Sequence, residues 1–379
     1  MRNKYIALLF LILTLMLSGC GGTQSQIIKI AVMGNPDAFH PGYQDGIERA
    51  VRDLNNEYSG SGYSVECEFC SDDGSYEAGA AIIDTLVADK TVTAVIGSNN
   101  MEINKTAAHV FDEAGKLFIV PYFLYDSVYL ENHYDTVFSL CKSAKTVGEL
   151  LCIAATQTTA KRWVVCADDD EFELAEMNGF LKYAAAGGIQ TVDCVNISEL
   201  ENNFDEVYKR WETLGVEGVV LFPTGNEGFE ILKKLKRRNP DLICGSDTVF
   251  DNSDLLVNDA ELRQAMTGFI MANAFVLDCQ TDEEAELVSR MAEEYTQETG
   301  NNLDTWYVHS YNTIRMIGDT AIKNKTCSSS SIARLLHENG YEGVGQRFYF
   351  NANGSQAGRV YAYEVFNENG YTDVYMYKE

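Results

Sequence analysis

Cysteine is the residue type whose side chains could do the most chemistry in this sequence, which contains ten cysteines. Cys67 and Cys70 form a C-x-x-C pair, the spacing of redox dithiols and of one half of a zinc site. Residues 63–69 alternate in polarity as a strand does, so a separation of three places the two side chains on opposite faces. No second C-x-x-C pair completes a metal site. We therefore interpret the pair as two separate structural thiols.

Four further cysteines lie in apolar segments, where a free thiol packs as a small hydrophobic side chain. They are Cys152, Cys166, Cys194 and Cys244. We expect these four side chains to be buried and unpaired.

No combination of side chains forms a recognisable catalytic or cofactor site. The motifs H-E-x-x-H and G-x-S-x-G are absent, and no G-x-G-x-x-G loop follows the first predicted strand. The five histidines lack metal-ligand spacing and are expected on the surface or in the core: His40, His109, His133, His309 and His337. We predict neither an enzyme nor a metal or cofactor site, with an exported hydrolase as the weakest alternative.

Three consecutive acids, Asp168 to Asp170, follow a predicted strand. They lack the glycine-centred loop of an EF-type calcium site, and such a run is most often a solvated loop. Near a ligand cleft, however, the same three carboxylates favour a cationic ligand.

The start of the chain is typical of an export signal. Arg2 and Lys4 precede an apolar run at residues 6–17, which is shorter than the roughly 20 apolar residues of a bilayer span. Small residues follow, as they do at a cleavage site. An ordinary secretory signal is one interpretation of this pattern.

Residues 17–20, Leu-Ser-Gly-Cys, resemble the lipobox of bacterial lipoproteins. The resemblance implies cleavage before Cys20 and a diacylglycerol thioether on its sulfur, and acyl chains of that kind hold a protein durably on a membrane. We therefore expect a lipoprotein signal peptide at residues 1–19 and a lipidated tether at residues 20–26. The mature protein would be extracytoplasmic and lipid-anchored to the bacterial cell membrane.

Composition restricts the partners. The 379 residues are 46% hydrophobic and 22% charged, which is typical of a globular protein large enough for two cores. The formal net charge of −27 repels nucleic acid and anionic headgroups, so no nucleic-acid partner is expected.

Short apolar strands alternate with amphipathic helices twice along the chain. Strands are expected at residues 27–34, 63–69, 93–97 and 116–123, and again at residues 160–168, 189–197, 216–223 and 241–247. After the first strand, Ile47, Ala50, Val51 and Leu54 recur as one face of a helix. The pattern predicts an α/β protein with two doubly wound, mainly parallel sheets. The C-terminal tail alternates strongly and contains Asn369-Gly370, a hairpin signal.

From Ile27 to the end, the chain resembles the type I periplasmic-binding-protein fold, and within it the branched-chain-amino-acid (Leu/Ile/Val)-binding receptors of ABC transporters. The resemblance lies in segments 28–55 (IKIAVMG…GYQDGIERAVRDLN), 93–121 (TAVIGSNN…AAHVFDEAGKLFIVP), 309–324 (HSYNTIRMIGDTAIKN) and 341–355 (YEGVGQRFYFNANGS). It implies a clamshell whose lobes are joined by three crossings. Residues 27–140 and 274–347 form lobe 1, and residues 141–273 and 348–379 form lobe 2.

The same resemblance implies a function. Such a protein captures a small molecule between its lobes by hinge closure and delivers it to the membrane permease and ATPase subunits of an ABC transporter. A ligand-sensing receptor of the same fold, coupled to a signalling partner, is the alternative.

The resemblance also identifies candidate ligand-binding residues in lobe 1. Phe39 stands where the family places an aromatic residue that touches the ligand. The loop after the third strand holds the ligand carboxylate in the family, and its candidates here are Ser98, Asn99, Asn100 and Met101. Capping of the next helix by Ser98 or Asn99 is the structural alternative. Where the family has small residues, this chain has Tyr122, Phe123 and Leu124, which either contact the ligand or pack between the lobes.

In lobe 2 the resemblance identifies Phe172 and Asp247. Phe172 stands at a tyrosine of the family, and Asp247 at the acid that neutralises a ligand ammonium. The amine end of an amino-acid site is thus retained, whereas the carboxylate end is altered. Two ligand classes follow: an amino acid whose carboxylate is held by backbone amides, or an amine, amide or aromatic compound.

Overall fold

The computed structural model describes residues 25–40, 42–130, 132–250, 258–273, 277–357, 360–367 and 372–378. The predicted signal peptide, Cys20 and most of the tether lie outside these residues, as does the Asn369-Gly370 turn. No helix in the described part of the chain has the length and apolar character needed to cross a membrane.

Lobe 1 contains a five-stranded parallel sheet with the order β2-β1-β3-β4-β5. Its strands are β1 (Gln26–Met33), β2 (Tyr63–Cys70), β3 (Val92–Ile96), β4 (Leu117–Val120) and β5 (Val137–Ser139). Alternate residues of β1 enter two hydrophobic clusters, with Ile28 and Ile30 on one face and Ala31 and Met33 on the other. The sheet is therefore covered on both sides, as its continuous apolar strands predict.

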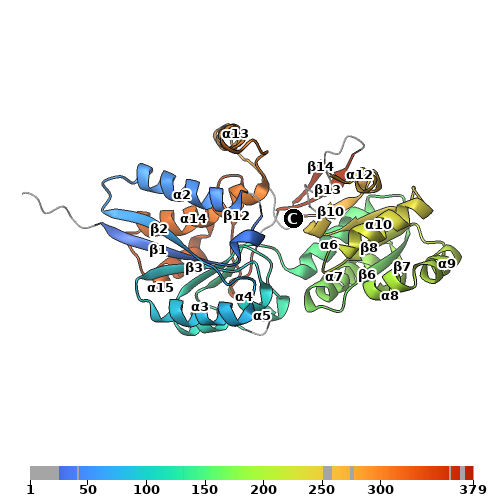
Figure 1. Cartoon of the computed structure of the whole chain (residues 1–379), viewed down its shortest axis with the longest axis horizontal. Helices are drawn as coiled ribbons and strands as arrows, with labels where there is room; N and C mark the ends of the chain where they lie inside the picture. Colours follow the sequence, from blue (N-terminus) through green and yellow to red (C-terminus); the bar gives the residue numbers. More distant parts are fainter. Residues whose placement is uncertain are drawn as a thin grey trace, which may run out of the picture.

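The helices of lobe 1 come from two distant parts of the sequence. One group is α2 (Tyr43–Glu57), α3 (Tyr76–Ala88), α4 (Met101–Glu113) and α5 (Asp126–Leu130), with the short 3-10 helix η1 (Pro36–Ala38). The other is α13 (Asp282–Thr299), α14 (Thr305–Lys323) and α15 (Ser329–Asn339), followed by the small hairpin of β11 (Tyr341–Gly343) and β12 (Gln346–Phe348). Both groups lie in the left-hand lobe of Figure 1.

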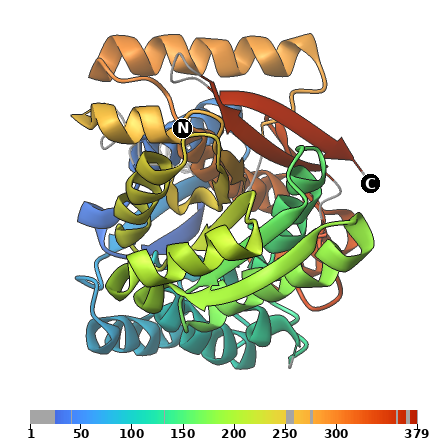
Figure 2. The ribbon, with the colours of Figure 1, turned by 90° about the vertical axis from the view of Figure 1, so that its right-hand side faces the viewer.

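Lobe 2 contains a seven-stranded sheet with the order β14-β13-β10-β9-β8-β6-β7. Its strands are β6 (Arg162–Ala167), β7 (Gln190–Asn196), β8 (Gly218–Phe222), β9 (Ile243–Ser246), β10 (Ile270–Ala272), β13 (Val360–Phe366) and β14 (Thr372–Lys378). The strands from β6 to β10 are parallel, and β13 and β14 join as an antiparallel pair. Figure 2, which faces lobe 2, shows this pair in red at the edge of the lobe.

The helices of lobe 2 are α6 (Ala144–Thr156), α7 (Glu171–Gly187), α8 (Ile197–Asn202), α9 (Phe204–Leu214), α10 (Glu227–Arg238) and α12 (Ala260–Met266), with the 3-10 helix η2 (Thr248–Phe250). Glycine allows α6 and α7 to pack closely, because a Cβ on Gly148 would lie 1.8 Å from the carbonyl oxygen of Glu176. The predicted fold class, two mainly parallel sheets in an α/β protein, is confirmed.

The chain passes between the lobes after β5, after β10 and after β12. At the first passage, the carboxylate of Asp126 in lobe 1 accepts hydrogen bonds from the backbone N–H groups of Ala144 and Lys145, at the start of α6 in lobe 2. Residues 137–139 form the edge strand β5 before the chain leaves lobe 1.

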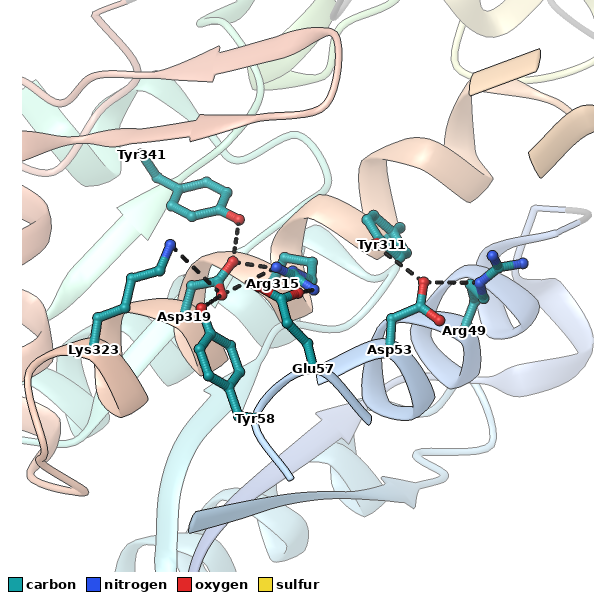
Figure 3. Close-up of polar contacts among 9 residues, drawn as sticks. All are labelled: Arg49, Asp53, Glu57, Tyr58, Tyr311, Arg315, Asp319, Lys323 and Tyr341. Atoms are coloured by element: carbon teal, nitrogen blue, oxygen red, sulfur yellow. Dashed lines mark hydrogen bonds and ion pairs between the residues drawn. The ribbon is translucent and has the colours of Figure 1, made fainter. Parts of the chain in front are cut away.

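Helix α14 is fixed to α2 by a network of polar groups around the buried carboxylate of Asp319 (Figure 3). The Asp319 carboxylate accepts hydrogen bonds from the hydroxyls of Tyr58 (2.7 Å) and Tyr341 (2.8 Å). Arg315 donates to both oxygens of Asp319, at 3.0 and 3.1 Å, and also to Glu57 at 2.8 Å. This network holds α14 in place, and the first turn of α14 reaches the space between the lobes.

The thiols largely follow the sequence interpretation. On β2, Cys67 packs against one cluster of lobe 1 and Cys70 against the cluster on the opposite face. Burial raises the pKa of the Cys67 thiol to about 12, whereas a redox dithiol needs a lowered pKa. All nine cysteines in the described ranges are unpaired. The prediction that Cys194 is buried was wrong: its side chain is exposed, because β7 is the edge strand of its sheet.

Candidate functional site

A cavity of about 610 Å³ lies between the two lobes. Its walls come from loops at the carboxyl ends of strands in both sheets. In lobe 1 these loops include those after β1 and β3, the two strands between which the strand order reverses. In lobe 2 they include those after β6 and β8, where the order of that sheet reverses. Ligands of open α/β sheets bind at such points, and the volume is typical of a small-molecule site.

The loop after β3 is shaped by its own side chains. Asn99 lines the cavity, and its amide accepts from Asn35 N–H and donates to the carbonyl of Ala38, which joins this loop to the one after β1. Ser98 is fully buried, where its hydroxyl donates to Asp72 at 2.5 Å. The cap of α4 is Asn100, which accepts from two backbone N–H groups, so capping by Ser98 or Asn99 was wrong.

Three rings form an aromatic wall on the lobe 1 side. Trp306, in the first turn of α14, stacks on His40 with a centroid distance of 4.3 Å and on Tyr122 with one of 5.0 Å. All three line the cavity. Phe39 is not among the lining residues; its ring packs beside Tyr43 at 5.0 Å, in the cluster on that face of the sheet.

The wall continues into lobe 2 through a contact between rings. Phe123 of lobe 1 meets Phe172 of lobe 2 edge to face, with centroids 4.9 Å apart, and both line the cavity. Nearby, Lys105 of α4 pairs with Glu171 of α7 at 3.3 Å, an ion pair between the lobes. Leu124 turns away into the core of lobe 1 and is only 3% exposed.

Carboxylates dominate the polar part of the lobe 2 wall. Asp247 follows β9, lines the cavity and is 7% exposed; the hydroxyl of Ser246 donates to it at 3.2 Å. Glu173, in the first turn of α7, also lines the cavity and is 6% exposed. Glu364 of β13 lines it as well and accepts a hydrogen bond from Asn273.

Burial of Glu173 alters its titration. Its low-polarity surroundings, together with the negative charges of Asp170 and Asp247, raise the pKa of this carboxyl to about 8. Deeper in lobe 2, Glu176 is 1% exposed, and burial together with Asp247 and Glu173 raises its pKa well above the ordinary value. On the opposite wall, desolvation lowers the pKa of the His40 imidazole to about 4.

Two of the three consecutive acids have structural partners. Asp168 accepts from the backbone N–H and the hydroxyl of Thr224, which joins the loops after β6 and β8. Asp170 caps α7 by accepting from the N–H of Phe172. Asp169 is exposed. No cluster of metal-ligating side chains was found within the described ranges.

The structure brings six of the predicted ligand-binding residues to the cavity: Asn99, Met101, Tyr122, Phe123, Phe172 and Asp247. Phe39, Ser98, Asn100 and Leu124 lie outside its lining. Sequence reasoning missed several residues that do line it, above all Glu173, Trp306 and Asp304. Of these three residues, only Glu173 could have been identified from the sequence, because it lies in the first helical turn after a predicted strand and its loop. The roles of all these residues in binding stay predictions.

Comparison with known proteins agrees with this architecture. A sequence model of the family described as periplasmic binding protein matches residues 30–370. The chain belongs to the periplasmic binding protein family. Its members are non-enzymatic solute-binding proteins, and membership implies an extracytoplasmic location. The resemblance inferred from sequence segments is thereby confirmed, whereas a comparison with curated proteins found no sequence match.

Solved structures of periplasmic binding proteins share the fold. An ABC transporter substrate-binding protein from Desulfitobacterium hafniense in complex with Leu is 21% identical, with a TM-score of 0.78 over 92% of this chain and 100% of that one. A branched-chain amino acid transporter substrate-binding protein from Streptococcus pneumoniae in complex with isoleucine is 16% identical, with a TM-score of 0.76 over 93% and 100%. A benzoate-bound solute-binding protein from R. palustris is 13% identical, with a TM-score of 0.71 over 92% and 95%.

Proposed function

We propose that this periplasmic binding protein is the solute receptor of an ABC transporter and that its ligand carries an ammonium group held by Asp247. The observation that carries the proposal is the cavity itself, which has walls from both lobes and a nearly buried carboxylate at the carboxyl end of β9. Structures of similar fold carry Leu, isoleucine or benzoate. Of these, the amino acids have the ammonium group that a carboxylate would neutralise.

Asp247 is suited to bind a cation because the protein holds it in a low-polarity wall. A charge-assisted hydrogen bond to a buried carboxylate contributes about 1.5–3 kcal/mol. Aromatic rings on the facing wall give the apolar part of the ligand a surface to pack on. Backbone N–H groups in the loop after β3 remain the candidates for holding a ligand carboxylate.

Capture by hinge motion is supported by the contacts between the lobes. Phe123 against Phe172 and Lys105 against Glu171 are interactions between side chains that separate if the lobes move apart. Closure of two domains around a ligand excludes water and strengthens the polar contacts inside. The closed outer surface is then what the membrane permease recognises.

Calorimetric titration with amino acids, amines, amides, benzoate and sugars tests the proposal. The parent is expected to bind at least one ammonium compound, and Asp247→Asn is expected to weaken that binding by about tenfold to a hundredfold, the equivalent of the lost charge-assisted bond. Asp241→Asn, at an exposed acid in the turn before β9, is the matched control and should bind like the parent. Binding of sugars or benzoate alone would refute the ammonium assignment.

We also propose that Cys20 carries the lipid that anchors the protein outside the cytoplasm. The support is the segment at residues 17–20 and the apolar run before it. Mass spectrometry of the protein from membranes should find an N-terminal Cys20 bearing a diacylglycerol group. In cells, the Cys20→Ala variant should be released from the membrane fraction. An unmodified sulfur on Cys20 of the parent would exclude the anchor.

A further inference from the structure

The apolar part of the cavity wall consists mainly of rings. Of the 17 residues that line the cavity, five carry an aromatic ring, and these five come from both lobes: His40, Tyr122, Phe123, Phe172 and Trp306. Among the described residues, Leu303 is the one branched aliphatic side chain in this lining. The apolar part of a ligand in this cavity therefore meets rings far more than it meets methyl groups.

Three of the rings are stacked on the lobe 1 side. The planes of Trp306 and His40 are 9° apart, those of His40 and Tyr122 are 23° apart, and those of Trp306 and Tyr122 are 29° apart. A further ring entering the cavity can extend this stack or meet the edges of its members, and aromatic pairs are favourable in both arrangements. A saturated group of the same size gains only the burial of its surface.

A second set of rings joins the two lobes. Phe123 and Phe172 meet with centroids 4.9 Å apart and planes at 63°, an edge-to-face pair. Phe172 is 4% exposed, and its backbone N–H is held by the carboxylate of Asp170 that caps α7. Phe123 packs against one hydrophobic cluster in each lobe. Both rings are therefore positioned by the fold, and a ligand ring beside them contacts both lobes at once.

Taking the proposed role as a solute receptor as given, we propose that the ligand carries a flat aromatic ring. Phe123 and Phe172 are the residues that select this ring over a saturated ring of the same size. The inference concerns the apolar part of the ligand and rests on the rings of the wall, so it holds whichever charged group the ligand bears.

Calorimetry on the purified full chain tests this with three pairs of probes, each pair sharing its charged group and differing in its ring. The pairs are 2-phenylethylamine and 2-cyclohexylethylamine, L-phenylalanine and L-cyclohexylalanine, and benzoate and cyclohexanecarboxylate. One aromatic pair contributes roughly twofold to tenfold in affinity beyond the area it buries. In at least one pair of probes, the aromatic member is therefore expected to bind about tenfold more tightly than its saturated partner.

Two variants assign the selection to residues. Phe172→Leu and Phe123→Leu keep the wall apolar but remove one ring, and each should reduce the aromatic preference to about threefold or less while the saturated probe binds nearly as before. Tyr183→Leu, at an exposed ring of the same helix α7, is the matched control and should keep the full preference. A merely structural role would weaken both members of a pair alike, and an unchanged ratio in both phenylalanine variants would refute the selection by these rings.

Two further results would overturn the inference: saturated probes that bind as tightly as their aromatic partners, or no binding of any aromatic probe. The charged group tests the proposed function separately. A preference for benzoate over cyclohexanecarboxylate, with no amine bound, supports the ring and refutes the ammonium assignment. Equal binding of the two amines that Asp247→Asn weakens refutes the ring and supports the ammonium assignment.

Discussion

Replacement of Glu173 by glutamine tests the electrostatics of the lobe 2 wall without any ligand. In the folded protein the pKa of this carboxyl is about 8, against 4.5 for an ordinary glutamate. The carboxyl must therefore take up a proton on folding at any pH between these values. Its contribution to stability is complete below pH 4.5 and is lost as the pH rises to 8. Glutamine has nearly the same shape but does not titrate.

The magnitude follows from the displacement of the pKa. The interval from pH 4.5 to pH 7 is about 2.5 pH units, and each unit corresponds to about 1.36 kcal/mol. Over this interval the unfolding free energy of the parent should therefore fall by about 3 kcal/mol relative to that of Glu173→Gln. Glu176, whose pKa is raised in the same direction, is present in both proteins and largely cancels in the comparison. The variant should therefore be the more stable protein at neutral pH.

Urea unfolding at pH 5 and pH 7.5 measures this difference directly. The gap in unfolding free energy between Glu173→Gln and the parent should widen with pH in favour of the variant. Glu201→Gln, on the exposed surface of α8, is the control and should show a constant gap. A gap for Glu173→Gln that stays constant between the two pH values would refute the reasoning.

Three further outcomes are expected. Gly148→Ala places a methyl group 1.8 Å from the Glu176 carbonyl oxygen and should lower the unfolding free energy by about 2 kcal/mol or more, measured in urea; a variant as stable as the parent would contradict the α6–α7 packing. Asp319→Asn removes the charge that faces Arg315 in Figure 3 and should lower the unfolding free energy by about 3 kcal/mol. A thermal melt can detect this loss, and an unchanged midpoint would disprove it. Lys105→Met removes an exposed ion pair and should change stability by less than about 1 kcal/mol; a larger loss would show that the pair is not simply a surface contact.

The fold was predictable because buried parallel strands leave a plain signal. Residues 93–97 and 116–123 are short apolar runs, and the fully buried strands β3 (Val92–Ile96) and β4 (Leu117–Val120) lie at these positions. Polarity alternation in residues 63–69 likewise predicted β2 and the opposite orientation of its two thiols. Cys194 was misjudged, because an apolar sequence context does not reveal which strand will lie at the edge of a sheet.

The cavity was only partly predictable. Residues that directly follow a strand, such as Tyr122 and Asp247, can be placed from the strand pattern, because parallel strands end at the same edge of their sheet. Asp304 and Trp306 come from a segment that returns to lobe 1 after the whole of lobe 2, and Glu364 lies on an added antiparallel strand. Periodicity identifies the buried face of such elements but not the distant residues they meet.

The most direct test of the account is small-angle X-ray scattering of the purified protein with and without the ammonium compound that calorimetry finds to bind most tightly. Capture between two hinged lobes predicts a smaller radius of gyration at saturation, and Asp247→Asn should need about tenfold to a hundredfold more of the compound for the same change. An unchanged radius of gyration with the parent at saturation, or conversion of the compound into a product during the measurement, would contradict it.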